Sequence, residues 1–178
     1  GTTGYPKGVM HSHIIIRNQI DRINRFGITF EDVIINNLPM VHLYDYSESA
    51  MSAILSGARQ VMIESFDATE TLQLIEAERA TIIHGFDTHY KDLFDCQARD
   101  RRDVSSLRLC TFPSGMESSS AISRRTQTIF APTITGWGMT ETWTFAASSF
   151  IDSTEEQRTE ASGFPMPDFE YRVIDPAT

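Results

Sequence analysis

Short runs of β-forming residues alternate with longer stretches of helical periodicity along this chain, and that alternation limits the fold more than any other feature. The predicted strands cover residues 33–38, 60–63, 81–83, 107–112, 133–135, 143–148 and 169–174. The predicted helices cover residues 11–26, 44–55, 69–79, 88–98 and 118–130, with Thr69 as an N-cap, and the polar segment 152–160 is predicted to be a loop. Strands that alternate with helices form βα units with right-handed crossovers. We therefore expect an α/β fold whose mostly parallel sheet is flanked by helices.

The chain is 178 residues long, with 40% hydrophobic and 22% charged residues. This length and composition are typical of a soluble globular domain with a substantial core. The formal net charge of −9 argues against a broad nucleic-acid footprint, because such a footprint needs a basic face. The same charge means that a site for polyphosphate has to be built locally, against the overall field.

Two cysteines, Cys96 and Cys110, lie in apolar or mixed segments, and neither belongs to a C-x-x-C pair. Reduced thiols in a cytosolic protein are favoured over a disulfide, so a cytoplasmic location is expected. No run of residues reaches the length of a transmembrane helix. The histidines lack the i, i+4 spacing of a helical metal pair, and no zinc site is predicted.

The first thirteen residues have the composition of a loop that wraps phosphates. Glycines allow close backbone approach, and backbone N–H groups can form an anion-binding concavity. Lys7 supplies a flexible positive charge, and Pro6 stiffens the approach to it by fixing its own φ. The lysine follows proline and precedes Gly8, so this is not a Walker A loop. An ordinary Gly/Pro turn is the alternative interpretation.

Three further loops follow predicted strands, and ligands of parallel sheets bind beyond the carboxyl ends of the strands. In the segment 136–141, Trp137 could stack on a base, Thr140 could donate to a phosphate oxygen, and Glu141 could hold magnesium. The turn 112–116 could edge an adenine, and His42 could touch a carboxylate or a phosphate. Taken separately, these loops are also typical of a Gly-rich turn with a core tryptophan, a plain strand-to-helix turn and a structural histidine.

Together and in this order, the string GTTGYPKG, the segment 39–42, the segment 114–116 and the string WGMTE resemble the adenylate-forming superfamily. That family includes acyl- and aryl-CoA synthetases, peptide-synthetase adenylation domains and beetle luciferases. Its phosphate loop reads [ST]-S-G-T-T-G-x-P-K-G and its later motif Y-G-x-T-E, with Trp137 here in place of the usual tyrosine. The segments 163–165 and 173–175 also resemble the family, so the resemblance covers essentially the whole chain and is closest to acyl-CoA synthetases.

The resemblance implies a role for each of these loops. The residues implied to cradle the β- and γ-phosphates are Thr2, Thr3, Gly4, Lys7 and Gly8. The residues implied to hold adenine and the α-phosphate are Ser114, Gly115, Met116, Trp137, Gly138 and Thr140. The acyl side is implied to use His42, His84, Gly85 and Gly136, and Glu141 is implied to bind Mg²⁺. Lys7, His42, Thr140 and Glu141 are the residues implied in catalysis.

The resemblance also implies a two-step reaction on a small carboxylic acid. The acid reacts with ATP to give an acyl-adenylate and pyrophosphate, and a thiol, usually coenzyme A, then displaces AMP. Adenylyl transfer depends mainly on positioning and charge neutralisation, so a covalent protein nucleophile is not needed. Fatty and aromatic acids both stay open as substrates, with fatty-acid metabolism one expected setting.

By the same resemblance, residues 1–150 are part of a large AMP-binding domain, and residues 151–178 form a loop and a last strand leading to a small β-subdomain. The family's ribose-binding acid, hinge and C-terminal domain are expected to lie outside this chain. We therefore expect a fragment that is not a competent enzyme alone and that self-associates through exposed apolar surface. Two alternatives stay open, namely a non-catalytic nucleotide-binding module and a peptide-synthetase adenylation domain.

Overall fold

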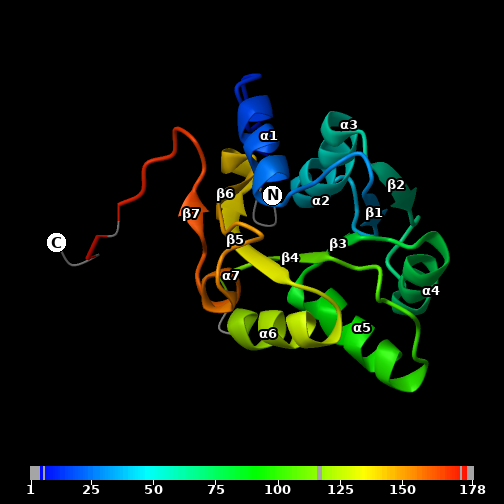
Figure 1. Cartoon of the computed structure of the whole chain (residues 1–178). Helices are drawn as coiled ribbons and strands as arrows, with labels where there is room; N and C mark the ends of the chain where they lie inside the picture. Colours follow the sequence, from blue (N-terminus) through cyan, green and yellow to red (C-terminus); the bar gives the residue numbers. More distant parts are fainter. Residues whose placement is uncertain (1–4, 6, 116–117, 173, 176–178) are drawn as a thin grey trace.

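The computed structural model describes residues 5, 7–115, 118–172 and 174–175, and its centre is one seven-stranded sheet (Figure 1). The strands are β1 (Val33–Asn36), β2 (Arg59–Met62), β3 (Ile82–His84), β4 (Leu109–Pro113), β5 (Thr133–Met139), β6 (Thr144–Ser148) and β7 (Phe164–Pro165). Their order in the sheet is β2-β1-β3-β4-β5-β6-β7. The first five strands pair in parallel, and β6 and β7 join as antiparallel strands. The prediction of a mostly parallel α/β sheet is confirmed.

Helices cover both faces of this sheet. They are α1 (Ile15–Arg25), α2 (Leu43–Asp45), the π-helix η1 (Tyr46–Met51), α3 (Ser52–Ser56), α4 (Ala68–Glu78), α5 (Asp87–Arg99), α6 (Ser119–Ile129), the 3₁₀ helix η2 (Thr140–Thr142) and α7 (Glu155–Glu160). In Figure 1, α1, α2 and α3 lie above the sheet, while α4, α5 and α6 lie below it. None of the helices in the described part of the chain is long and apolar enough to cross a membrane.

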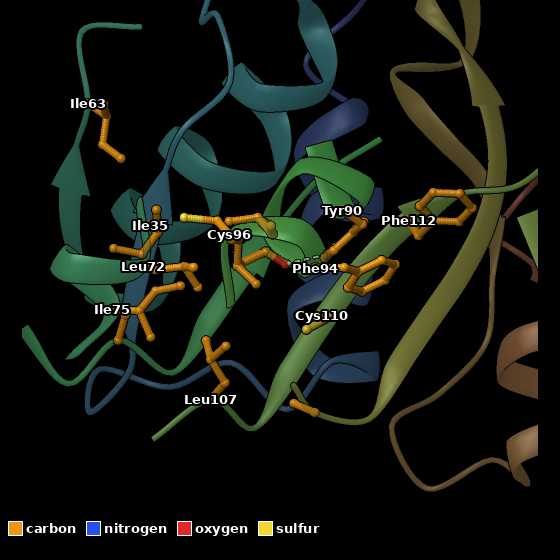
Figure 2. Packing of buried hydrophobic residues seen from close by; sticks show 14 of the residues in the cluster. Ile35, Ile63, Leu72, Ile75, Tyr90, Phe94, Cys96, Leu107, Cys110 and Phe112 are labelled. Carbon is orange, nitrogen blue, oxygen red and sulfur yellow. Dashed lines mark hydrogen bonds between the residues drawn. The ribbon is translucent and has the colours of Figure 1, made fainter. Parts of the chain in front are cut away.

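The alternation of side chains along the strands supplies a hydrophobic core to each face. In β1, Ile35 packs into the core shared with α4, α5 and α6, whereas Ile34 packs into the core shared with α1, α2 and α3. Figure 2 shows the first core, where Tyr90 of α5 packs beside Phe112 of β4, with 5.9 Å between ring centroids. Both cysteines are free and buried. A parallel sheet buried on both faces explains why its strands read as short apolar runs.

Two helix predictions differ from the structure because of local capping. The N-cap of α4 is Asp67, whose carboxylate accepts from the N–H of Glu70, so the predicted cap at Thr69 is wrong by two residues. The segment 152–160 is not wholly a loop, since α7 forms within it. Thr154 and Gln157 make a reciprocal capping box there, a Thr-x-x-Gln signal that outweighs the polar composition.

Two strand predictions also differ. β5 does not stop at Thr135 but continues to Met139, because the segment 136–139 pairs with β6. The predicted strand at 169–174 is wrong for its described residues, which carry no strand, and the last strand of the described sheet is β7. The chain turns at Asp168, which has a φ of +65°, before alternation resumes at Phe169. Alternation alone does not make a strand where a pairing partner is missing.

The order of the strands reverses between β1 and β3. From β1 the chain crosses to β2 on one side and then returns to β3 on the other side. In open α/β sheets such a switch point opens a crevice beyond the carboxyl ends of its strands. The loops that follow β1 and β3 are therefore the first place to look for a ligand site, and the loops after β4 and β5 continue the same edge.

Candidate functional site

The turn that carries Thr140 and Glu141 joins the end of β5 to the start of β6. The register of the two strands shifts between Trp137 and Gly138, which is a β-bulge. A Cβ atom at Gly138 would lie 1.5 Å from the carbonyl oxygen of Thr144, so only glycine fits there. Thr140 and Glu141 follow in the short helix η2 with exposed side chains, available to a ligand.

A cavity of about 360 Å³ lies where the exit of the N-terminal loop meets this turn. It is lined by Met10, His11, Ser12, Ile14, Ile15, Asn18, Glu141, Thr142, Pro167, Asp168 and Phe169. His11 Nε2 lies 2.8 Å from the carbonyl oxygen of Thr140, and because a carbonyl only accepts, the imidazole is the donor. The two loops that the sequence analysis selected for phosphates are thus in contact, although 129 residues separate His11 from Thr140.

Not all of the predicted phosphate and adenine residues can be placed. Lys7 and Gly8 are exposed, and a Cβ atom at Gly8 would meet nothing within 4 Å. Lys7 stands four residues before His11, which ties this end of the loop to the turn. The predicted residues Thr2, Thr3, Gly4 and Met116 lie outside the described residues.

A second cavity, of about 350 Å³, lies beside the middle of β5. It is lined by Trp137, Ala147, Ser162, Gly163, Pro165 and Tyr171. The ring of Tyr171 meets the indole of Trp137 edge to face, with 6.0 Å between their centroids. Ser114 reaches the rim of this cavity, since its hydroxyl donates to the carbonyl of Gly136 at 3.0 Å and lies 3.1 Å from the hydroxyl of Ser162. Aromatic walls with few polar groups are typical of a site for a flat ligand.

The loops after β1 and β3 meet at the switch point of the sheet. His42 caps α2, because its Nδ1 accepts from the N–H of Tyr44 at 3.2 Å. The ring of His42 packs edge to face against Phe86, with 5.6 Å between centroids. His42 and the segment 84–86 are therefore neighbours, as the substrate-pocket prediction required of them.

The interior behind this surface is packed with rings joined by hydrogen bonds. His84 is fully buried, and its Nδ1 lies 2.6 Å from the hydroxyl of Thr111, which also lies 2.7 Å from the hydroxyl of Tyr44. Burial lowers the pKa of His84 to about 3, so its imidazole is neutral at physiological pH. A Cβ atom at Gly85 would lie 2.8 Å from the ring of Tyr90, which makes glycine the residue that fits at this position.

Gly136 also lies directly against the packed interior. A Cβ atom there would lie 2.6 Å from the carbonyl oxygen of Ala147 and 2.7 Å from the ring of Phe145. The packing of β5 against β6 therefore requires glycine at this buried position.

Sequence reasoning missed two residues of this region. Tyr44 and Thr111 read as core residues of a helix and a strand, and the topology brings both of them to His84. Tyr44 is the one of them that the sequence could have indicated, because it stands two residues after His42 and its hydroxyl needs a partner wherever the ring is buried.

Asp45 is fully buried beside this region, and we expect it to make stability depend on pH. Its carboxylate accepts from the hydroxyl of Ser49 at 2.7 Å, and burial raises its pKa to about 6 from the ordinary value of 3.8. Between about pH 4 and pH 6 the folded chain holds a proton that the unfolded chain has released, so stability falls as pH rises through this window.

Replacing Asp45 by asparagine should therefore raise the free energy of unfolding by about 2–3 kcal/mol at pH 7 and change it little at pH 4. Urea denaturation at both pH values measures the difference. Asp95→Asn, a change at an exposed position of α5, is the matched control and should have little effect at either pH. Equal effects of Asp45→Asn at pH 4 and pH 7 would contradict the assignment.

The carboxylate of Glu141 suits a metal ion that is shared with a ligand. Among the described residues, no group of three or more His, Cys, Asp or Glu side chains could hold a metal by itself. Magnesium often takes one protein carboxylate and completes its octahedron with phosphate oxygens and waters. Two exposed carboxylates line the first cavity. Asp168 is paired with Arg17 at 2.6 Å, so Glu141 is the one that fits this pattern.

Known proteins resemble this chain in sequence and in fold. It is 30% identical over 188 residues to 4-coumarate–CoA ligase 1 of Oryza sativa subsp. japonica, covering 100% of this chain and 33% of the relative. It is 27% identical over 180 residues to the medium-chain fatty-acid–CoA ligase of Escherichia coli (strain K12), covering 99% of this chain and 31% of that one. The crystal structure of ATP-bound MatB from Rhodopseudomonas palustris superposes with a TM-score of 0.86 at 26% identity, covering 100% of this chain and 35% of MatB.

The chain spans about a third of the length of these curated relatives. A family model described as AMP-binding enzyme matches residues 1–178, which is the whole chain. The match agrees with the mostly parallel sheet and with the contact between its two motif loops. This chain therefore belongs to the family of AMP-binding enzymes.

Proposed function

We propose that this chain provides the nucleotide site for ATP-dependent activation of a carboxylic acid, followed by transfer of the acyl group to coenzyme A. In the first step a carboxylate oxygen attacks the α-phosphorus of ATP, the bond to the β-phosphate oxygen breaks, and pyrophosphate leaves. In the second step the sulfur of the thiol attacks the acyl carbonyl, AMP leaves with its electron pair, and the thiol proton passes to solvent. The contact between His11 and Thr140 at the first cavity carries the proposal, because it joins the two loops suited to phosphates.

The phosphate end of the nucleotide is proposed to lie between the N-terminal loop and the turn after β5. Thr2, Thr3, Gly4, Lys7 and Gly8 would surround the β- and γ-phosphates, and the hydroxyl of Thr140 would donate to the α-phosphate. Glu141 would hold Mg²⁺, which when bound neutralises phosphate charge. The exposed positions of Lys7, Thr140 and Glu141 support these roles, and a local cation matters in a chain with a net charge of −9.

The adenine is proposed to lie against Trp137 at the second cavity. The indole gives a flat face there, and the backbone of Gly138 leaves it uncovered. The segment 114–116 would run along the edge of the base, and the bond from Ser114 to the carbonyl of Gly136 supports this because it fixes Ser114 beside β5. Stacking on an aromatic face is favourable for any base, so the edge contacts would carry the specificity.

The acid is proposed to lie over the switch point of the sheet, beside His42, Gly85 and Gly136. His42 would orient the carboxylate through its free Nε2, since its Nδ1 is occupied by the N–H of Tyr44. The two glycines would allow close approach of the acyl group. His84 would act from behind this surface, because its buried neutral ring is bonded to Thr111.

The names of the relatives support coenzyme A as the thiol, since both curated relatives are described as CoA ligases. One of them is named for 4-coumarate and the other for medium-chain fatty acids, so both acids stay within the proposal. We also propose a cytosolic location on the basis of the two free, buried cysteines, and residues 1–150 as part of the AMP-binding domain.

Nucleotide binding tests this proposal directly. The chain should bind ATP more tightly with Mg²⁺ than without it, as measured by isothermal titration calorimetry. Lys7→Ala should weaken ATP binding by about 10- to 100-fold, the equivalent of one charge-assisted hydrogen bond. Glu141→Gln should abolish the gain that Mg²⁺ gives.

The only other lysine, Lys91, is the matched control. It lies on α5 with its ammonium 3.8 Å from Asp87, and Lys91→Ala should leave ATP binding unchanged. Absence of ATP binding, or binding that is insensitive to Lys7→Ala, would contradict the proposal. Carboxylate-dependent exchange of pyrophosphate into ATP, measured with a longer protein that contains this chain, would separate catalysis from a non-catalytic nucleotide-binding module.

A further inference from the structure

The turn between β5 and β6 has a backbone that its own residues do not favour. Trp143 has a φ of +54° and Thr144 a φ of +66°, both in the left-handed region. A tryptophan and a β-branched threonine in that region cost about 1–3 kcal/mol each and persist only where the surroundings impose them. The contacts that impose this backbone therefore also fix the position of Glu141, two residues before Trp143.

Two of these contacts come from the segment that follows the phosphate loop. His11 donates from Nε2 to the carbonyl of Thr140 at 2.8 Å. The same imidazole meets the ring of Trp143 edge to face, with 5.3 Å between centroids. A single side chain thus contacts both ends of the turn, on either side of Glu141.

Further contacts come from the buried face of α1. The carbonyl oxygen of the Gln19 side chain accepts from the indole N–H of Trp143 at 3.1 Å. The guanidinium of Arg22 donates to the main-chain carbonyls of Trp143 and Phe145, each at 3.3 Å. Arg22 is itself fixed, because it is fully buried and its Nε lies 3.1 Å from a carboxylate oxygen of Glu48. The turn is thus contacted by the buried face of α1 and by His11, which lies in the segment before α1.

We propose that His11 is a positioning residue that couples the phosphate loop to the carboxylate of Glu141. His11 stands four residues after Lys7, and its imidazole contacts the turn that carries Glu141 at both ends. This inference rests on the proposed function, because it assumes that Lys7 and Glu141 share one ligand. Its consequence is that the gain in ATP affinity from Mg²⁺ depends on the His11 side chain, although His11 is not itself a ligand of the metal.

The test measures that gain in variants of His11. His11→Leu keeps apolar contact with Trp143 but cannot donate to Thr140, and it should reduce the Mg²⁺-dependent gain in ATP affinity by about 10-fold, at the low end of the effects of groups that support a metal ligand. Affinity for AMP should fall less than affinity for ATP, because AMP lacks the β- and γ-phosphates and keeps only the α-phosphate that Thr140 would contact. His11→Gln, whose amide can donate from a similar position, should recover most of the gain.

A double-mutant cycle shows whether the effect passes through the metal ligand. In a chain that already carries Glu141→Gln, His11→Leu should cost nothing further, since its effect acts through that carboxylate. His13→Leu, the same change at an exposed histidine two residues away, is the matched control and should leave the gain intact. If His11→Leu does not fold, His11→Asn gives the same readout, because its shorter amide does not reach Thr140.

The outcomes separate the two proposals. A wild-type chain whose ATP binding ignores Mg²⁺ would overturn the proposed function together with this inference. A wild-type chain with a normal Mg²⁺ gain that His11→Leu leaves intact would overturn the inference alone. A His11 variant that loses affinity for ATP and AMP equally would also overturn the inference alone, because a purely structural role predicts that pattern.

Discussion

Replacing Glu48 by leucine should lower the free energy of unfolding by about 3–5 kcal/mol, the largest loss we expect from one side chain of the core. The carboxylate of Glu48 lies in the fully buried interior beside the guanidinium of Arg22, and it also accepts from the hydroxyl of Thr144 at 2.7 Å. Burial lowers the pKa of the Arg22 guanidinium, and the charge of Glu48 opposes that shift. Without Glu48, a fully buried guanidinium loses the carboxylate that lies beside it.

Urea denaturation of the variant and the parent chain measures this loss. Glu78→Leu is the matched control, because Glu78 pairs with Arg59 at the surface, where an ion pair contributes less than about 1 kcal/mol. Arg22→Met combined with Glu48→Leu should recover part of the loss, since it removes the unpaired charge but also the donors to the turn. A loss from Glu48→Leu as small as that from Glu78→Leu would show that the buried pair is not needed.

Replacing Gly138 by alanine should lower the free energy of unfolding by at least about 4 kcal/mol, which only severe disruptions of a fold produce. The added Cβ atom would lie 1.5 Å from the carbonyl oxygen of Thr144 and 2.4 Å from its carbonyl carbon. Both are main-chain atoms of the neighbouring strand, so no rotamer change relieves the clash, and the β5–β6 pair has to separate locally. Gly85 differs, because the atoms that its Cβ would meet belong to the side chain of Tyr90.

The midpoint of thermal unfolding by circular dichroism, together with urea denaturation, checks this prediction. Gly8→Ala is the matched control for stability, because a Cβ atom there would meet nothing within 4 Å. Gly138→Ala should also abolish any binding of ATP, since Trp137 and Glu141 lie on either side of the disrupted bulge. Stability within 1 kcal/mol of the parent chain would mean that the strands separate at little cost, contrary to the packing seen here.

Much of the fold could be predicted because periodicity and topology rules act on short stretches. Apolar runs such as β1 and β3, followed by helices, allow few arrangements other than a parallel sheet. The places of His42 after β1 and of Ser114 after β4 could be predicted as well, because an apolar run precedes each of them. The length of β5 could not, since the glycines at 136 and 138 read as a loop until β6 supplies hydrogen-bond partners.

The buried face of α1 is the part that sequence reasoning could least anticipate. Gln19, Arg22 and Arg25 are polar, and a polar stripe on a helix normally faces solvent, yet all three are buried. Gln19 and Arg22 bind groups of η1, and Arg22 also donates to the main chain of the β5–β6 turn. Arg25 donates to carbonyls at the end of β6 and in β7, and all of these partners stand far away in the sequence. The π-helix could not be predicted either, because the segment 44–55 has ordinary helical periodicity.

The contacts that hold the β5–β6 turn also bear on the order in which the chain assembles. The two strands of that hairpin are close in sequence and can pair early, whereas His11, Gln19 and Arg22 reach the turn across 121 to 129 residues. Contacts of such long separation form only after most of the loop-closure entropy has been lost. The left-handed backbone at Trp143 is therefore among the last parts of the molecule to be fixed. A chain with a well-formed sheet but an undocked α1 would look folded, and yet the turn that carries Glu141 would not be held in position.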